Sequence, residues 1–145
     1  MAGGSTPRGV RMDLSFRNQA GVIARIHAAD RACQAGVREA TTSAGEFCRE
    51  LTQLYAPVDE GNMRDLVRTV YDAEGFSFET GWDASDFARL NLPFYPPYQE
   101  FGTRFMPAQP SLYPAYKETQ RYYLEAVRAN VRAAIARART GAATV

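Results

Sequence analysis

A single apolar stripe runs along the first third of the chain. From about residue 18 to 56 the apolar positions follow one another at alternating steps of three and four, which is one face of an amphipathic helix. Pro57 ends this predicted helix, because the residue before a proline is pushed out of the α region. The stripe consists of Val22, Ile26, Ala29, Cys33, Val37, Ala40, Ala44, Phe47, Leu51 and Leu54.

This helix exceeds the usual length of about 8–20 residues. The middle of its stripe is made of small side chains, so we expect another element to approach closely there. Gly36 and Gly45 each cost about 1 kcal/mol relative to alanine and are places where the helix could bend. A helix this long would overhang the core of one small domain, so we expect it to lie across a sheet and also to touch a neighbouring subunit.

The middle of the chain carries shorter patterns. Residues 64–71 alternate loosely and residues 76–82 alternate cleanly, which predicts two strands joined by a hairpin loop at residues 72–75. In the second strand Phe76, Phe78, Thr80 and Trp82 share one face. Asp83 is expected to cap a short helical turn that reaches Phe87, and residues 90–98 are a candidate edge strand. Ser111 can cap a last helix over residues 112–138, whose inward positions are predicted to be Tyr116, Tyr123, Val127, Val131 and Ile135.

The order helix, antiparallel strands, loop, helix predicts an α+β fold, with one small antiparallel sheet packed by a long N-terminal helix and a C-terminal helix. Residues 18–140 form the expected single domain, residues 1–17 a flexible arm and residues 141–145 a tail. The 145 residues can bury one good core. A net charge of +1 gives no bulk attraction to nucleic acid or membrane. The sequence contains no run of about 18 apolar residues, so no membrane span is predicted.

Residues 95–115 hold five prolines and, beyond Tyr95, four further aromatic residues. Proline fixes φ and removes a hydrogen-bond donor, so this segment is incompatible with a helix interior or a central strand. It contains no nucleophile–base pair and no metal-ligand spacing. Aromatic residues and methionine supply contact area at protein interfaces. The segment is therefore predicted to be an assembly surface.

The sequence offers little that would support catalysis. Cys33 and Cys48 would lie about 22 Å apart on one helix, beyond disulfide reach, and are read as small core residues. His27 borders the apolar stripe without an evident partner. Glu100 is the best carboxylate candidate, yet acid–base work needs a second group, so we expect it to accept N–H bonds in the Gly102-Thr103 turn or to pair with Arg104. Gly102 is expected to adopt positive φ. We predict that the chain is not an enzyme, contains no metal site and binds no cofactor.

Charge is distributed unevenly along the chain. Residues 72–86 carry five acids and no base, whereas residues 117–139 carry six bases against two acids. Two solvated faces would explain this pattern. Complementary charge between neighbouring subunits, or a basic surface facing DNA, would explain it equally well. If DNA passes nearby, we expect the arginines at 128, 132, 137 and 139 to be divided between subunit contacts and solvent.

The aromatic and proline-rich segment also resembles a known family. Its Tyr-x-x-Tyr-x-Glu-Phe-Gly-Thr string, followed by Met-Pro-Ala-Gln-Pro and a Pro-Ala entry into the last helix, is similar to the head–tail joining family of long-tailed bacteriophages, also called tail-completion or tail-terminator proteins. The resemblance covers roughly residues 18–140. The family often has Thr where this chain has Glu60, and Phe where it has Ser111-Leu112. The matching residues are Tyr95, Tyr98, Glu100, Phe101, Gly102, Thr103, Met106, Pro107, Ala108, Gln109, Pro110, Leu112, Pro114 and Ala115.

The resemblance implies a structural virion protein made in the host cytoplasm and located in the tail or neck. It would form a ring, usually a hexamer, that caps the tail tube and joins it to the head connector, with DNA passing through the lumen without specific binding. The alternatives are another connector layer (adaptor or stopper), a small nucleic-acid-binding module, or a small enzyme of unknown type. The residues expected at the interface are Tyr95, Tyr98, Glu100, Phe101, Gly102, Thr103, Arg104, Met106, Pro107 and Pro110.

Overall fold

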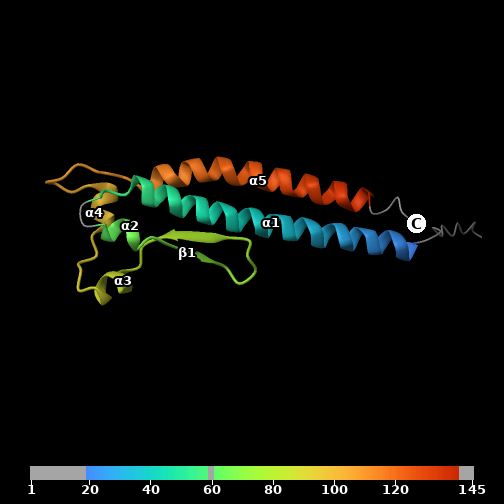
Figure 1. Ribbon diagram of the computed structural model, residues 1–145, viewed down its shortest axis with the longest axis horizontal. Helices are drawn as coiled ribbons and strands as arrows, with labels where there is room; N and C mark the ends of the chain where they lie inside the picture. The colour runs from blue at the N-terminus through green and yellow to red at the C-terminus, as the bar shows by residue number, and fades with distance from the viewer. Residues whose placement is uncertain (1–18, 59–60, 141–145) are drawn as a thin grey trace, which may run out of the picture.

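A computed structural model describes residues 19–58 and 61–140. Two long antiparallel helices form the main body of the fold, a β-hairpin lies along one of them, and three short helices lie at one end (Figure 1). The expected arm and tail lie outside the described residues. The elements are α1 (Gln19–Tyr55), α2 (Asn62–Asp65), β1 (Arg68–Tyr71), β2 (Phe78–Gly81), α3 (Ala84–Arg89), α4 (Pro96–Phe101) and α5 (Leu112–Thr140).

The close approach predicted for the small middle of the first helix is confirmed. Ala40 and Ala44 are fully buried, and α5 packs along this part of α1. At Gly36 the two backbones come so near that an added Cβ would lie 3.2 Å from the Cβ of Asn130. The Asn130 side chain donates a hydrogen bond of 3.0 Å to the Gly36 carbonyl. Small side chains therefore set the spacing of the helix pair.

The predicted stripe of α1 is buried only in its middle. Val22 and Ile26 at its start and Leu54 near its end are exposed. The reason is visible in the arrangement of the elements, because the hairpin and the short helices cover only the C-terminal half of α1 (Figure 1). The N-terminal half extends beside α5 alone, which leaves one flank of the stripe uncovered.

The inward face predicted for the last helix is partly wrong. Tyr116 and Ile135 are exposed, and the buried positions of α5 are Ala115, Thr119 and Ala134. The buried face of α5 is shifted by about one residue from the predicted face. Small residues on the contact line allow the two helices to pack closely, whereas large rings there would hold them apart. The tyrosines are displaced to the flank of the helix pair.

The hairpin is confirmed, with shorter strands than predicted. β1 and β2 pair antiparallel in a register that places Thr69 opposite Thr80 and Tyr71 opposite Phe78. Residues 62–65 form a helical turn in place of the expected start of the first strand. The Asp72 carboxylate accepts the N–H groups of Phe76 and Ser77, which organises the loop. These bonds hold the pKa of Asp72 below its ordinary value, with the Ser77 N–H the largest cause.

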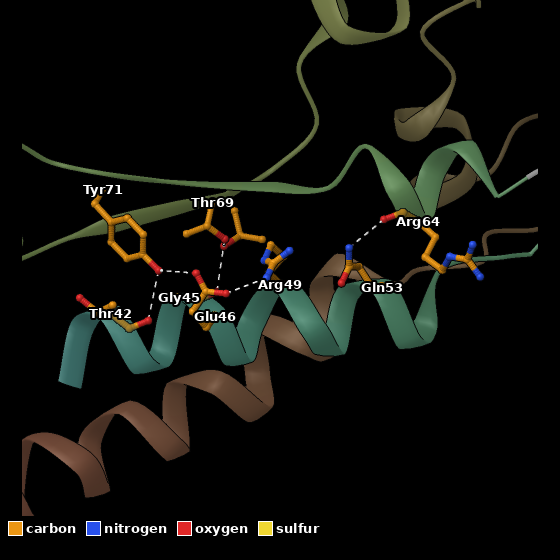
Figure 2. Close-up of polar contacts among 9 residues, drawn as sticks. Thr42, Gly45, Glu46, Arg49, Gln53, Arg64, Thr69 and Tyr71 are labelled. Atoms are coloured by element: carbon orange, nitrogen blue, oxygen red, sulfur yellow. Dashed lines mark hydrogen bonds and ion pairs between the residues drawn. The ribbon is translucent and has the colours of Figure 1, made fainter. Parts of the chain in front are cut away.

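The hairpin docks on α1 at a glycine. The Tyr71 hydroxyl donates to the Thr42 carbonyl, and Thr69 donates to the Gly45 carbonyl (Figure 2). A Cβ at Gly45 would lie 2.6 Å from the Tyr71 hydroxyl oxygen, so only glycine lets the ring lie flat against the helix. Gly45 and Gly36 thus mark two places where another element approaches α1 closely.

Residues 90–98 do not form the predicted edge strand. The chain follows an irregular path after α3, with Asn91 at φ 56°, and enters α4 at Pro96. Two prolines are compatible with α4 because they occupy its first turn, where an N–H has no intrahelical partner. The predicted cap at Asp83 is confirmed, since its side chain accepts the Ser85 N–H at 2.8 Å. With a two-stranded antiparallel sheet packed on long helices, the fold is α+β as predicted.

Candidate assembly surface

Glu100 connects α4 to the start of α5. One oxygen of its carboxylate accepts the Ser111 N–H at 2.7 Å, the Leu112 N–H at 2.9 Å and the Ser111 hydroxyl at 2.6 Å. The first N–H groups of a helix lack intrahelical partners, and a negative charge there is favourable. The predicted structural role of Glu100 agrees with this geometry, but its partners are not those expected. Arg104 lies over the Phe105 ring, 5.6 Å from its centroid, and Glu100 takes the place of Ser111 as the cap of α5.

Gly102 shapes the segment between the two helices, which we call the aromatic loop (residues 101–110). Its φ of 73° confirms the predicted positive value. An added Cβ would lie 2.7 Å from the Ala108 nitrogen, so a larger residue is excluded by contact as well as by conformation. Thr103 and Met106 exchange backbone hydrogen bonds of 2.8 and 3.3 Å, which closes a tight turn at the tip.

The start and the tip of this loop present aromatic rings to solvent. Phe101 is 85% exposed and Phe105 is 91% exposed. The loop itself is held by the Glu100 cap and by the Gln109 N–H, which donates to the Gln99 carbonyl at 2.7 Å. It extends past the ends of both long helices (Figure 1). Rings exposed on a constrained, projecting loop contribute almost nothing to the core, which is typical of a contact surface.

An apolar groove lies beside the aromatic loop. Its volume is about 1120 Å³, and its walls come from β2 on one side and from α4 and α5 on the other, with Cys48 and Thr119 contributed by the helix pair. Among the described residues that line it, Glu100 alone carries a charge, and that carboxylate is occupied by the α5 cap. The groove exists because the hairpin and α5 pack on different flanks of α1. Its main apolar side chains are Phe78, Trp82, Phe101, Leu112, Tyr116 and Leu124.

The walls of the groove are mainly apolar. Two of its polar groups are already placed in the fold. The Trp82 N–H donates to the Met63 carbonyl at 2.6 Å, and the Thr119 hydroxyl is buried without a hydrogen-bond partner. No pair of acid and base faces it among the residues that line it. His27 is exposed on the overhanging part of α1, far along the helix from Cys48. Both cysteines are free thiols.

The structure separates the predicted interface residues into four groups. Tyr95 is half-buried and packs edge-on against Phe87, with ring centroids 5.4 Å apart. Phe101, Pro110 and Glu100 border the groove. Tyr98 and Met106 line a smaller hollow of about 270 Å³ behind the loop. The remaining residues form the turn of the aromatic loop: Gly102, Thr103, Arg104 and Pro107.

Sequence reasoning missed several residues of this surface. Phe105, the most exposed ring, was not among the expected interface residues, although it lies inside the motif. The face shared by Phe76, Phe78, Thr80 and Trp82 was predicted, but not that it would line a groove. Tyr113 was missed as well. The available signal was the number of aromatic residues on α5 and β2, which exceeds what a helix pair spaced by alanines can bury.

Apart from Glu100, the charged residues lie outside the groove walls. Arg68 forms ion pairs with Asp83 and Asp86, and Arg89 pairs with Asp86. The Ser85 contacts of Asp83 hold the pKa of that carboxyl below its ordinary value. Glu74 and Glu79 are exposed and form no side-chain ion pair within residues 19–58 and 61–140. Of the five acids in the predicted acidic segment, only Asp83 and Asp86 are therefore paired with arginines of the described ranges.

Other classes of site find no support in the part of the chain that the structure describes. It contains no cluster of three or more His, Cys, Asp or Glu side chains suited to a metal ion. Nor does any described helix have the length and apolar character needed to cross a bilayer. No protein-family model matches the chain, and neither the curated proteins nor the solved structures show a significant similarity to it.

Proposed function

We propose that this chain is a structural virion protein, a tail-terminator or tail-completion subunit of a long-tailed phage or phage-like particle. The observation that carries the proposal is the aromatic loop. A constrained, projecting loop exposes Phe101 and Phe105 beside an apolar groove that has no catalytic groups. Such a surface is suited to binding another protein.

The motif that resembles the head–tail joining family coincides with this loop and its supports. Glu100 caps α5, Gly102 provides the positive φ, and the residues from Met106 to Pro110 return the chain to the helix. Each of these residues has a geometric reason to be where it is. The resemblance and the geometry of these residues both support the proposal that the segment builds an exposed contact surface.

In this proposal the chain forms a homo-oligomeric ring, hexameric as in the family it resembles. The ring caps the head-proximal end of the tail tube and contacts the tail tube protein on one side and the head connector on the other. DNA passes through the lumen without specific binding, and the protein resides in the tail or neck of the virion. An adaptor or stopper layer would use the same kind of surface and is the nearest alternative.

The decisive experiment is electron microscopy of purified protein mixed with tail tubes. We expect density at one end of each tube. Phe105→Asp should abolish this end decoration because it places a charge at the tip of the contact surface, whereas Leu54→Asp, at an exposed site on α1 away from the loop and the groove, should not. Tubes that stay bare with the unmodified protein, or decoration that survives in Phe105→Asp, would contradict the proposal.

A small nucleic-acid-binding module is the second candidate, and one observation favours it. Four arginines of α5, at positions 128, 132, 137 and 139, are exposed and form no ion pair with any described residue. If they contacted phosphates, affinity for DNA would fall steeply as salt is raised. Filter binding of the purified protein to duplex and single-stranded DNA at several salt concentrations distinguishes the two candidates.

A further inference from the structure

The overhanging part of the helix pair is a second apolar surface. We define the helix-pair end as residues 19–35 of α1 and 125–140 of α5. Val22 and Ile26 are 50% and 61% exposed there, and Ile23 and Ile135 are nearly half exposed. At about 100° per residue, Val22, Ile23 and Ile26 fall within one arc of about 100° on α1. No other described element covers them (Figure 1).

This end is also strongly basic. It carries six arginines against the carboxylates of Asp30 and Glu125, which leaves a formal charge of +4. The arginines form no ion pair with any residue in the described ranges. The six are Arg25, Arg31, Arg128, Arg132, Arg137 and Arg139.

The groove at the other end of the molecule has the opposite charge beside it. Residues 68–89, which we call the acidic hairpin, carry five carboxylates against Arg68 and Arg89 and so have a formal charge of −3. Glu79 lies on the strand face opposite Phe78, so it flanks the groove and does not line it. The electric field of the Glu79 carboxylate still acts on a protein bound in the groove, because the Debye length at physiological salt is about 8 Å.

The two surfaces cannot meet within one chain. Ile26 and Cys48, which mark the helix-pair end and the groove, are 22 positions apart on α1, so they lie about 33 Å apart at 1.5 Å per residue. A second copy of the chain, however, offers each surface its complement. Both surfaces are apolar at the centre, one has an excess of positive charge and the other an excess of negative charge.

We propose that the helix-pair end of one copy docks in the apolar groove and against the acidic hairpin of the next. The apolar side chains of α1 enter the groove, and the arginines lie near Glu74 and Glu79. The contact joins two unlike surfaces, so each added copy exposes the same pair of surfaces again, and the association closes into a ring if its rotation permits. This inference rests on the proposed function, because it specifies the contact that would build the ring.

Two substitutions at exposed positions test the contact by complementation. Ile26→Asp disables the helix-pair end and leaves the groove intact, whereas Tyr116→Asp, at a residue 53% exposed in the groove wall, does the reverse. Leu54→Asp is the control, since Leu54 is 73% exposed on α1 and belongs to neither surface. Circular dichroism of each variant establishes that its helices are intact.

Sedimentation velocity then gives the assembly state. We expect the unmodified chain and Leu54→Asp to associate, and each of the other variants to sediment as a monomer. An equimolar mixture of the two variants should give dimers and nothing larger, because each pair retains one intact contact. Single variants that assemble like the unmodified chain, or a mixture that stays monomeric, would overturn the proposal. So would an unmodified chain that is monomeric up to about 1 mM.

Charge reversal separates this contact from nucleic-acid binding. Arg132→Glu combined with Arg139→Glu should weaken self-association by about fivefold to tenfold, and adding Glu74→Arg with Glu79→Arg should restore it. If the arginine substitutions leave self-association unchanged but abolish DNA binding, the arginines contact nucleic acid and the proposal is overturned. End decoration of tail tubes is scored separately, so a terminator that assembles through other surfaces would still be recognised.

Discussion

At the residue scale, Glu100 and Gly102 hold the aromatic loop by different physical means. Glu100 brings a charge to three donors at the start of α5, and Gly102 takes a backbone conformation that side chains rarely adopt. Neither residue faces a second catalytic group. Their effects should therefore be seen in stability and assembly.

Gly102→Val should be severely destabilising. The substitution combines positive φ, which costs about 1–3 kcal/mol in a residue other than glycine, with a Cβ placed 2.7 Å from the Ala108 nitrogen. We expect a lower melting temperature and loss of particle assembly. Gly81→Val is the matched control, because a Cβ there meets no atom within 4 Å. Equal stability of the two variants would contradict the backbone argument.

Glu100→Ala should destabilise the start of α5 by about 1–2 kcal/mol, because it removes the acceptor of two backbone N–H groups and a buried hydroxyl. Glu100→Gln should cost less, since an amide oxygen can still accept. Chemical denaturation measures both. A larger loss of stability in Glu100→Gln than in Glu100→Ala would indicate a role for the carboxylate other than capping.

The pH dependence of the hairpin follows from Asp72. The pKa of the Asp72 carboxyl is lowered in the folded chain, because its ionised form accepts the N–H groups of Ser77 and Phe76. These bonds therefore contribute stability at pH values above the ordinary carboxyl pKa of 3.8. The contribution is lost as the pH falls below 3.8 and the carboxylate becomes protonated. Amide exchange of residues 76–78 should therefore become faster in acid. Asp72→Asn should remove this pH dependence, and a profile unchanged by the substitution would refute the assignment.

At the element scale, spacing is set by glycine and alanine. The period of the apolar residues predicted both long helices and the strands of the hairpin, and residue type predicted the Asp83 cap, because these features depend on local geometry. The rotation of α5 could not be predicted, because it depends on how near Gly36 allows Asn130 to come. The groove was missed for the same reason, since it arises from two elements packing on different flanks of α1.

Gly45→Val should separate the hairpin from α1. The new side chain would overlap the Tyr71 ring, whose hydroxyl bonds the Thr42 carbonyl. We expect faster hydrogen exchange throughout residues 68–81 while the helix pair stays protected. Combining Gly45→Ala with Tyr71→Ala, which removes the ring that a Cβ at residue 45 would strike, should recover part of the loss. Uniform destabilisation of helices and hairpin would show that the docking is not a separate unit.

At the scale of the whole molecule, a large amount of apolar surface stays uncovered, which supports the proposal that the chain functions in an assembly. The groove, the aromatic loop and the helix-pair end are three separate exposed regions. A ring contact through the groove and the helix-pair end would cover two of them. The aromatic loop would remain available to a different partner, which suits a subunit placed between the tail tube and the head connector.

The last prediction concerns the arginines of α5 in the assembled particle. A channel that passes DNA must not hold phosphate tightly, because strong binding would stall its movement. If the helix-pair end contacts the acidic hairpin of the next copy, some of the arginines at 128, 132, 137 and 139 are used there and the others face solvent. We therefore expect a particle reconstruction to show several copies of this chain with these arginines divided between subunit contacts and solvent. A single copy per particle would contradict the ring. A band formed by Arg128, Arg132 and Arg139 facing the central channel would instead indicate that the chain grips DNA.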